Sequence, residues 1–234
     1  MTSDRPSLQA ELLRWSEGHA AATVAVAFAV AAGWPLWLVS ACGAVSFAFL
    51  IRRCRGLWTP AGRFGPANAL TLARLAGVLA LPLLAPMQLA WVGAILLALD
   101  GVDGWIARRN GHDGEFGEFF DKESDAFFLL LLCLMLYRLP AGFGAWILVP
   151  GLLRYLFVLY LKFARPPSPK EPRSAGAGWV FVLTMAALLA CFAGYPDRLQ
   201  LLRPLAAAMS LILALSFARS LYRMYRGSRP RVAG

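Results

Sequence analysis

The sequence predicts an all-α integral membrane protein, and three observations support this prediction. Hydrophobic residues make up 59% of the 234 residues, and the mean hydropathy is +0.59. Charged residues make up only 15%, whereas soluble domains carry about 25%. The apolar segments run for roughly 20 residues each, the length of a transmembrane helix, and lack the alternation of transmembrane β-strands. We expect about eight spans in one compact bundle.

The segments before residue 66 differ from those that follow. Residues 1–18 are expected to form an amphipathic segment on the membrane surface, with a disordered tail as the alternative. The next two apolar segments are short, and Gly33-Trp34-Pro35 separates them with residues that favour a turn. We expect a helical hairpin and a basic cytoplasmic loop over residues 19–65, with one bent span as the alternative. The eight apolar segments cover residues 19–33, 35–51, 68–86, 88–107, 119–137, 141–162, 178–194 and 201–222.

Basic residues gather in alternate loops, and this asymmetry predicts the orientation. The poorer set of loops holds only Arg138, Arg198 and Arg203. The richer set therefore faces the cytoplasm, as do both ends of an eight-span chain. Basic residues near the surface attract anionic lipids by about 1 kcal/mol each, so the net charge of +10 needs no nucleic-acid partner. The richer set holds Arg52, Arg53, Arg55, Arg63, Arg108, Arg109, Lys122, Lys162, Arg165, Lys170, Arg173, Arg219, Arg223, Arg226, Arg229 and Arg231.

The acidic residues are concentrated between two spans on the cytoplasmic side. Eight of the 13 fall between Asp100 and Asp125. Asp100 and Asp103 are three apart at the end of one span, and Asp121 and Asp125 are four apart at the start of the next. Residues at these spacings share a helix face, and the glycine-rich turn RNGHDGEFG can bring the two helices together. The two pairs can therefore converge on one point.

Four converging carboxylates would repel one another in a site of low dielectric constant, and a bound cation removes that repulsion. Oxygen ligands favour Mg²⁺, Mn²⁺ or Ca²⁺ over zinc. Four carboxylates can hold two such ions, an arrangement used for displacement at phosphorus. The alternative is a solvated acidic loop that caps two helices. The remaining acidic residues lie off the shared faces or in the turn and are expected to be solvated: Asp113, Glu115, Glu118 and Glu123.

Further residues complete a longer pattern. Gly104 and Ala107 are small enough for close approach of a backbone or a flat ligand, and the planar fork of Arg108 can bind phosphate. Taken alone, these three residues also fit helix packing and topology. The whole pattern resembles the signature of the CDP-alcohol phosphotransferases in every fixed position: Asp100-x2-Asp103-Gly104-x2-Ala107-Arg108-x8-Gly117-x3-Asp121-x3-Asp125. The segment PANALTLAR is similar to the Pro-Asn-x-Leu-Thr-x-x-Arg opening of that family's first core helix, with one extra residue after Pro66.

The resemblance implies a fold and a reaction. Residues 66–234 would form a six-helix membrane domain whose site opens to the cytoplasm of a bacterial inner membrane. The enzyme would transfer a phosphatidyl-type group from a CDP-linked lipid, CDP-diacylglycerol, to a small alcohol and release CMP in phospholipid synthesis. Members of the family often pair through their spans, so the resemblance is compatible with a homodimer.

The resemblance also implies residue roles. Asp100, Asp103, Asp121 and Asp125 would bind two divalent cations, Mg²⁺ or Mn²⁺, with Ca²⁺ as an inhibitory occupant. Asp125 would also deprotonate the attacking hydroxyl. The residues implied in CDP binding are Gly104, Ala107, Arg108, Gly117, Asn68 and Thr71.

The acceptor alcohol is less well defined. Arg154 lies inside the apolar run GLLRYLFVLYLKF, and an intramembrane arginine is a candidate functional residue. With Lys170 and Arg173 it would bind a phosphorylated acceptor, glycerol 3-phosphate or an inositol phosphate. The alternatives are snorkelling basic residues and an unphosphorylated acceptor such as serine, choline or inositol, because FDKESDAFF departs from the Leu-Asp-x-x-Ala-Asp-Lys pattern of glycerol-phosphate acceptors. A cation transporter is the alternative of another class, but its carboxylates would be spread through the membrane depth.

Overall fold

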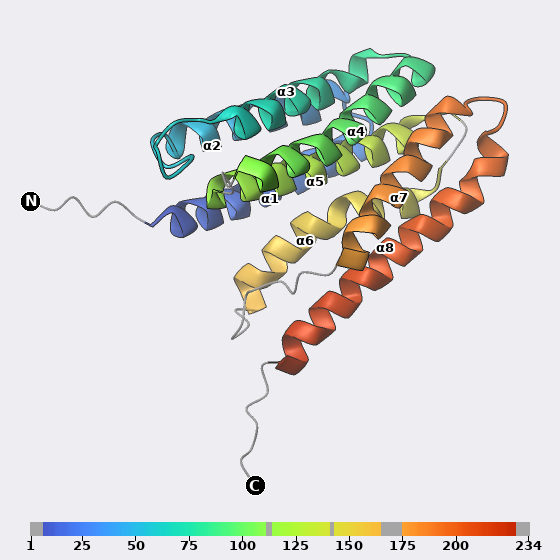
Figure 1. Cartoon of the computed structure of the whole chain (residues 1–234). Helices are drawn as coiled ribbons and strands as arrows, with labels where there is room; N and C mark the ends of the chain where they lie inside the picture. The colour runs from blue at the N-terminus through green and yellow to red at the C-terminus, as the bar shows by residue number, and fades with distance from the viewer. Residues whose placement is uncertain (1–6, 111–113, 141–142, 165–174, 228–234) are drawn as a thin grey trace, which may run out of the picture.

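The computed structural model describes residues 7–110, 114–140, 143–164 and 175–227, and for residues 101–110, 164, 175 and 225–227 it describes the backbone alone. Within these residues the chain has eight α-helices, two short 3-10 helices and no strand (Figure 1). The prediction of an all-helical fold is confirmed, and each apolar segment corresponds to one α-helix. The α-helices are α1 (Leu8–Ala31), α2 (Trp37–Arg53), α3 (Pro66–Ala80), α4 (Pro86–Asn110), α5 (Glu115–Arg138), α6 (Leu148–Ala164), α7 (Ala175–Ala193) and α8 (Leu199–Gly227), and the 3-10 helices are η1 (Leu81–Leu83) and η2 (Ala145–Ile147).

Four stretches of the described chain are long and apolar enough to cross a membrane. They are Pro66–Leu83, Ala145–Phe163, Gly176–Ala193 and Leu199–Met224. Pro86–Asp100 in α4 is apolar but shorter. Helix α5 is long enough, but its first half carries several charged residues, among them Asp121 and Asp125 of the predicted site. The chain therefore has the character of a membrane protein, and the predicted total of eight spans remains a prediction.

The first helix is longer than predicted. The Ser7 hydroxyl caps it by accepting a hydrogen bond from the Ala10 N–H, and the helix then runs without a break through residue 18 to Ala31. Residues 8–18 are therefore the first part of α1 rather than a separate segment, because nothing in them interrupts the helix. Gly33, with φ of +115°, follows in a conformation that favours glycine, and α2 folds back against α1.

Helix α5 lies at the centre of the bundle. It contacts α1, α3, α6 and α7 (Figure 1). Every residue from Ala126 to Leu136 is buried, as expected for a helix that is apolar on all sides. The charged first half of α5 is continuous with this core, so the position of its backbone relative to the neighbouring helices is fixed.

The neighbours of α5 bring residues distant in sequence to its charged half. Helices α3 and α4 pack against each other, and α3 also packs against α5. Helix α7 packs against α4 and α8, and α8 also packs against α6, so that α6, α7 and α8 form the other flank of the bundle (Figure 1). The charged half of α5 therefore faces a different set of helices on each side.

Candidate active site

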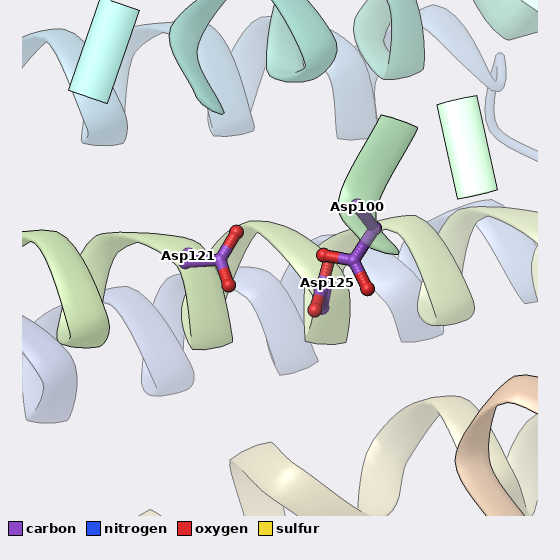
Figure 2. Close-up of side chains that lie close together, drawn as sticks. All are labelled: Asp100, Asp121 and Asp125. Atoms are coloured by element: carbon purple, nitrogen blue, oxygen red, sulfur yellow. The ribbon is translucent and has the colours of Figure 1, made fainter. Parts of the chain in front are cut away.

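Three of the four predicted aspartates come together. Asp100 lies in the second half of α4, and Asp121 and Asp125 lie one turn apart on α5 (Figure 2). One carboxylate oxygen from each lies within 4.8 Å of the others. All three side chains are half-buried, and we call them the carboxylate cluster. Asp103 follows Asp100 by about one helical turn, but its side chain lies outside the described residues.

A buried arginine of α3 binds all three carboxylates. Arg74 Nη2 lies 2.8 Å from Asp100 Oδ1 and 2.7 Å from Asp125 Oδ1, and Arg74 Nη1 lies 2.8 Å from Asp121 Oδ1. The Arg74 side chain is only 4% exposed, so its charge is held inside the bundle beside the cluster. The planar guanidinium can contact several carboxylates at once, which the single ammonium of a lysine does less well.

The described charges of this site do not balance. Among the described side chains, one guanidinium faces three carboxylates, so these four groups together carry a net negative charge. Such a set of hard oxygen donors with excess negative charge fits Mg²⁺ or Mn²⁺. The residues present therefore fit the divalent cations that the sequence predicted, with Asp103 as a further candidate ligand.

The residues predicted on the nucleotide side form a tightly packed contact between α3 and α5. Asn68 is buried, and its Nδ2 donates to the Phe64 carbonyl at 2.5 Å. A Cβ atom at Gly117 would lie 2.7 Å from Asn68 Oδ1, so glycine is required for this approach. Thr71 is also buried and donates to the Ala67 carbonyl at 3.2 Å. The side chains of Gly104, Ala107 and Arg108 lie outside the described residues.

A pocket adjoins the carboxylate cluster. It has a volume of about 300 Å³ and lies between α5, α6, α7 and α8, and we call it the α5–α8 pocket. Asp125 contributes a carboxylate to its lining, and Lys122 and Arg154 contribute positive charges. Gly178, Phe181 and Ser216 line the opposite side. Arg154 therefore lies beside the cluster, whereas Lys170 and Arg173, the other predicted acceptor residues, lie outside the described residues.

The prediction that Glu123 is solvated is wrong. Its side chain is 1% exposed, and Glu123 Oε1 accepts hydrogen bonds from Arg154 Nη2 at 2.7 Å and Arg154 Nε at 3.2 Å. The face of α5 that carries Glu123 is covered by α1 and α6, which the spacing of the aspartates did not predict. Glu115 and Glu118 are exposed, as predicted, while Asp113 lies outside the described residues.

Sequence reasoning gave Arg74 no role, although it is the buried cation that contacts the carboxylate cluster. The signal was present, because Arg74 is an arginine within the apolar run that begins at Pro66, and such a residue is a functional candidate. The same rule singled out Arg154. The structure shows that Arg74 deserved equal weight, since it contacts every member of the carboxylate cluster.

The fold and the site define a class of protein: a helical membrane protein with clustered carboxylates and a pocket beside them. Comparison with known families then identifies the chain. The family model for CDP-alcohol phosphatidyltransferases matches residues 64–218, more than half of the sequence, and the chain belongs to this family. Membership supports a transferase that moves a phosphatidyl group from a CDP-linked alcohol to an acceptor. Searches of curated proteins and of solved structures gave no match.

Proposed function

We propose that this chain transfers a phosphatidyl-type group from CDP-diacylglycerol to a small, phosphorylated alcohol and releases CMP. The observation that carries the proposal is the carboxylate cluster, in which three oxygens of Asp100, Asp121 and Asp125 converge within 4.8 Å beside a pocket. Transfer at phosphorus depends chiefly on positioning and on neutralising charge. A cluster of this kind serves both requirements when it holds divalent cations.

The aspartates would hold two cations, Mg²⁺ or Mn²⁺, through Asp100, Asp103, Asp121 and Asp125. When bound, these ions supply neutralisation of the pyrophosphate charge. Arg74 offsets part of the repulsion between the carboxylates and fixes their orientation from α3. Because Arg74 is buried, the cluster keeps its geometry in the absence of substrate.

Asp125 is the proposed general base. It belongs to the cluster and also lines the α5–α8 pocket, so it lies where an acceptor hydroxyl would meet the donor. An Asp125 carboxylate oxygen takes the hydroxyl proton as the acceptor oxygen bonds to the lipid-bearing phosphorus. The pyrophosphate P–O bond breaks, and the electron pair leaves with CMP. General-base catalysis of this kind contributes about 10²–10⁴-fold.

The α5–α8 pocket is the proposed acceptor site. Arg154 and Lys122 place positive charge within the same lining as Asp125, which favours an acceptor that carries a phosphate. Glycerol 3-phosphate and an inositol phosphate fit this requirement, and Lys170 and Arg173, which follow α6 in the sequence, are proposed to add to it. An unphosphorylated acceptor, serine, choline or inositol, is the alternative.

The cytidine is proposed to bind on the other side of the cluster, against α3 and α4. Gly104 and Ala107 would leave space for the base, and Arg108 would bind phosphate. Gly117, Asn68 and Thr71 would form the wall between α3 and α5. In this arrangement the donor and the acceptor approach the cluster from different sides.

The proposed setting is a bacterial inner membrane. Residues 66–234 would form the six-helix core, the hairpin of α1 and α2 would add two spans, and the site would face the cytoplasm, where the basic loops contact anionic lipids. The chain is compatible with a homodimer, and no nucleic acid is proposed as a partner.

The test is acceptor-dependent release of CMP. Purified protein in detergent receives CDP-diacylglycerol and Mg²⁺ or Mn²⁺, then glycerol 3-phosphate, inositol phosphate, inositol, serine or choline in separate reactions, with EDTA as the control. We expect release with a phosphorylated acceptor and none with EDTA. Release with an unphosphorylated acceptor alone would contradict the acceptor assignment. No release with any acceptor would contradict the proposed reaction, and metal-dependent cation flux in vesicles would then support a transporter.

A further inference from the structure

Helix α1 lies outside the region that matches the family, yet it reaches the residue that we assign to the acceptor. The Ser16 hydroxyl of α1 donates to Glu123 Oε1 at 3.4 Å, the same oxygen that accepts from Arg154. Resting on the proposed function, we propose that α1 is a positioning element for the acceptor site: Ser16 and Glu123 orient Arg154 toward the α5–α8 pocket. Specificity for the acceptor would then depend on a part of the chain that the family core lacks.

The contact with Glu123 holds one edge of the Arg154 guanidinium. Both Nε and Nη2 of Arg154 donate to one oxygen of Glu123, and Glu123 is 1% exposed. A buried carboxylate with a hydrogen-bonded partner is strongly held in place, because leaving it unpaired is costly. Arg154 is 23% exposed, so it remains accessible from the pocket while Glu123 anchors it.

Arg154 lines two pockets. A second pocket, of about 390 Å³, lies between α1, α5 and α6, and we call it the α1 pocket. Gln9, Ser16 and Phe119 line it, and it shares Lys122 and Arg154 with the α5–α8 pocket. A long side chain with room on two sides retains rotamer freedom that must be lost on binding. The hydrogen bonds to Glu123 remove this freedom beforehand, and Ser16 holds Glu123 from the side of the α1 pocket.

Helix α1 is itself docked on both helices that carry the pair. On α5, the Trp15 ring meets Phe119 edge-on at 5.8 Å between centroids. On α6, the His19 ring lies 5.6 Å from that of Tyr155, the residue after Arg154. These contacts bracket Ser16 along α1. The position of Ser16 relative to Glu123 is therefore set by packing on both sides.

The experiment measures KM for acceptor and donor separately. Ser16→Ala removes the hydroxyl, and Ser16→Thr restores one. Glu123→Gln keeps the size of the side chain but removes the charge. Ser40→Ala is the matched control, because it removes from α2 of the same hairpin a hydroxyl that has no hydrogen-bond partner among the described residues. Each variant is assayed for CMP release with the acceptor that supports turnover in the unaltered chain.

We expect Ser16→Ala to raise KM for the acceptor about threefold, the size of one lost hydrogen bond, and Glu123→Gln to raise it by about tenfold or more. KM for CDP-diacylglycerol and kcat should change less than about twofold, Ser16→Thr should recover most of the loss, and Ser40→Ala should match the unaltered chain. Because Ser16 acts through Glu123, the double variant should be no worse than Glu123→Gln alone.

Other outcomes overturn the proposal. An unchanged acceptor KM in Ser16→Ala would show that Ser16 does not position Arg154, and this result stands even if Glu123→Gln fails to fold. Equal rises in both KM values would show disturbed packing rather than positioning. Absence of CMP release from the unaltered chain with every acceptor would overturn the proposed function and this inference together, whereas release with unchanged KM values in the variants overturns this inference alone.

Discussion

The first half of α5 carries two ionic clusters that differ in charge balance and exposure. On one face, Asp121 and Asp125 join Asp100 around Arg74, so that three described carboxylates contact one guanidinium. The side chains of the three aspartates are 21–35% exposed. On another face, Glu123 forms an ion pair with Arg154 and accepts a hydrogen bond from Ser16, and Glu123 is 1% exposed. The two clusters lie within one helical turn of each other along α5.

The difference between the two clusters indicates two functions for charged residues inside the bundle: binding a cation and positioning another side chain. An accessible cluster with excess negative charge favours the binding of cations. In the second cluster the carboxylate of Glu123 is enclosed, so its effect is to fix the position of Arg154, whose guanidinium stays partly exposed. We therefore assign metal binding to the first cluster and positioning to the second, and the variants below test that assignment.

The largest effect is expected for Asp125→Asn. Loss of the general base should lower kcat by about 10²–10⁴-fold, while binding of CDP-diacylglycerol is largely retained, because Asn is nearly the same size as Asp. Rates of CMP release and equilibrium binding of the donor check this expectation. Asp197→Asn, the same change in an exposed turn between α7 and α8, is the matched control. Normal turnover by Asp125→Asn would show that the base is another residue.

Asp100→Asn should weaken metal binding and activity together. Loss of even an outer-shell partner lowers metal affinity by about 10–100-fold, and loss of a ligand should cost at least as much. The Mg²⁺ concentration for half-maximal CMP release measures the change, and higher Mg²⁺ should recover part of the rate. Undiminished activity at low Mg²⁺ would contradict the assignment of Asp100 as a ligand.

Arg74→Gln tests the charge balance of the carboxylate cluster. Removing one partner of a buried ionic group lowers the free energy of unfolding by about 3–5 kcal/mol. Because the carboxylates around Arg74 are partly exposed, we expect a loss of about 3 kcal/mol, at the lower end of this range. For a chain of this size the Tm should fall by about 6–10 °C in EDTA. Mg²⁺ should raise the Tm more in the variant than in the unaltered chain, because the carboxylates of the variant have lost the positive charge of the Arg74 guanidinium. An equal response of both proteins to Mg²⁺ would contradict this account of Arg74.

The smallest effect is expected for Lys162→Met. Lys162 Nζ lies 2.9 Å from Glu17 Oε2, but the lysine side chain is 48% exposed. Exposed ion pairs contribute about 0–1 kcal/mol, so the Tm should change by less than about 3 °C, and CMP release should be unaffected. A fall in Tm as large as that of Arg74→Gln would show that exposure does not distinguish these ionic contacts.

Much of the fold followed from the sequence because apolar runs of membrane length are visible without any knowledge of packing. Each of the eight runs corresponds to an α-helix. The start of α1 was harder to predict, because residues 8–18 are helical and contain buried Leu12 and Trp15 but are not continuously apolar. The position of a helix end depends on capping residues such as Ser7, and a hydropathy profile does not detect capping residues.

The site could be predicted only where its residues are close in sequence. The spacing of Asp121 and Asp125 puts both on one face of a helix. Arg74 lies 47 residues from Asp121, and no local pattern connects the two. Glu123 was misassigned because its environment depends on α1 and α6, which cover that face of α5. Contacts between distant segments require the tertiary structure.

The most direct test of the central claim is Mn²⁺ binding by the purified protein, measured by equilibrium dialysis for the unaltered chain, Asp121→Asn and Glu123→Gln. We predict two Mn²⁺ per unaltered chain, weakened binding in Asp121→Asn and unchanged binding in Glu123→Gln, because only the first acidic residue belongs to the carboxylate cluster. Binding by Asp121→Asn equal to that of the unaltered chain, or an equal loss in Glu123→Gln, would contradict the assignment of the metal site to that cluster.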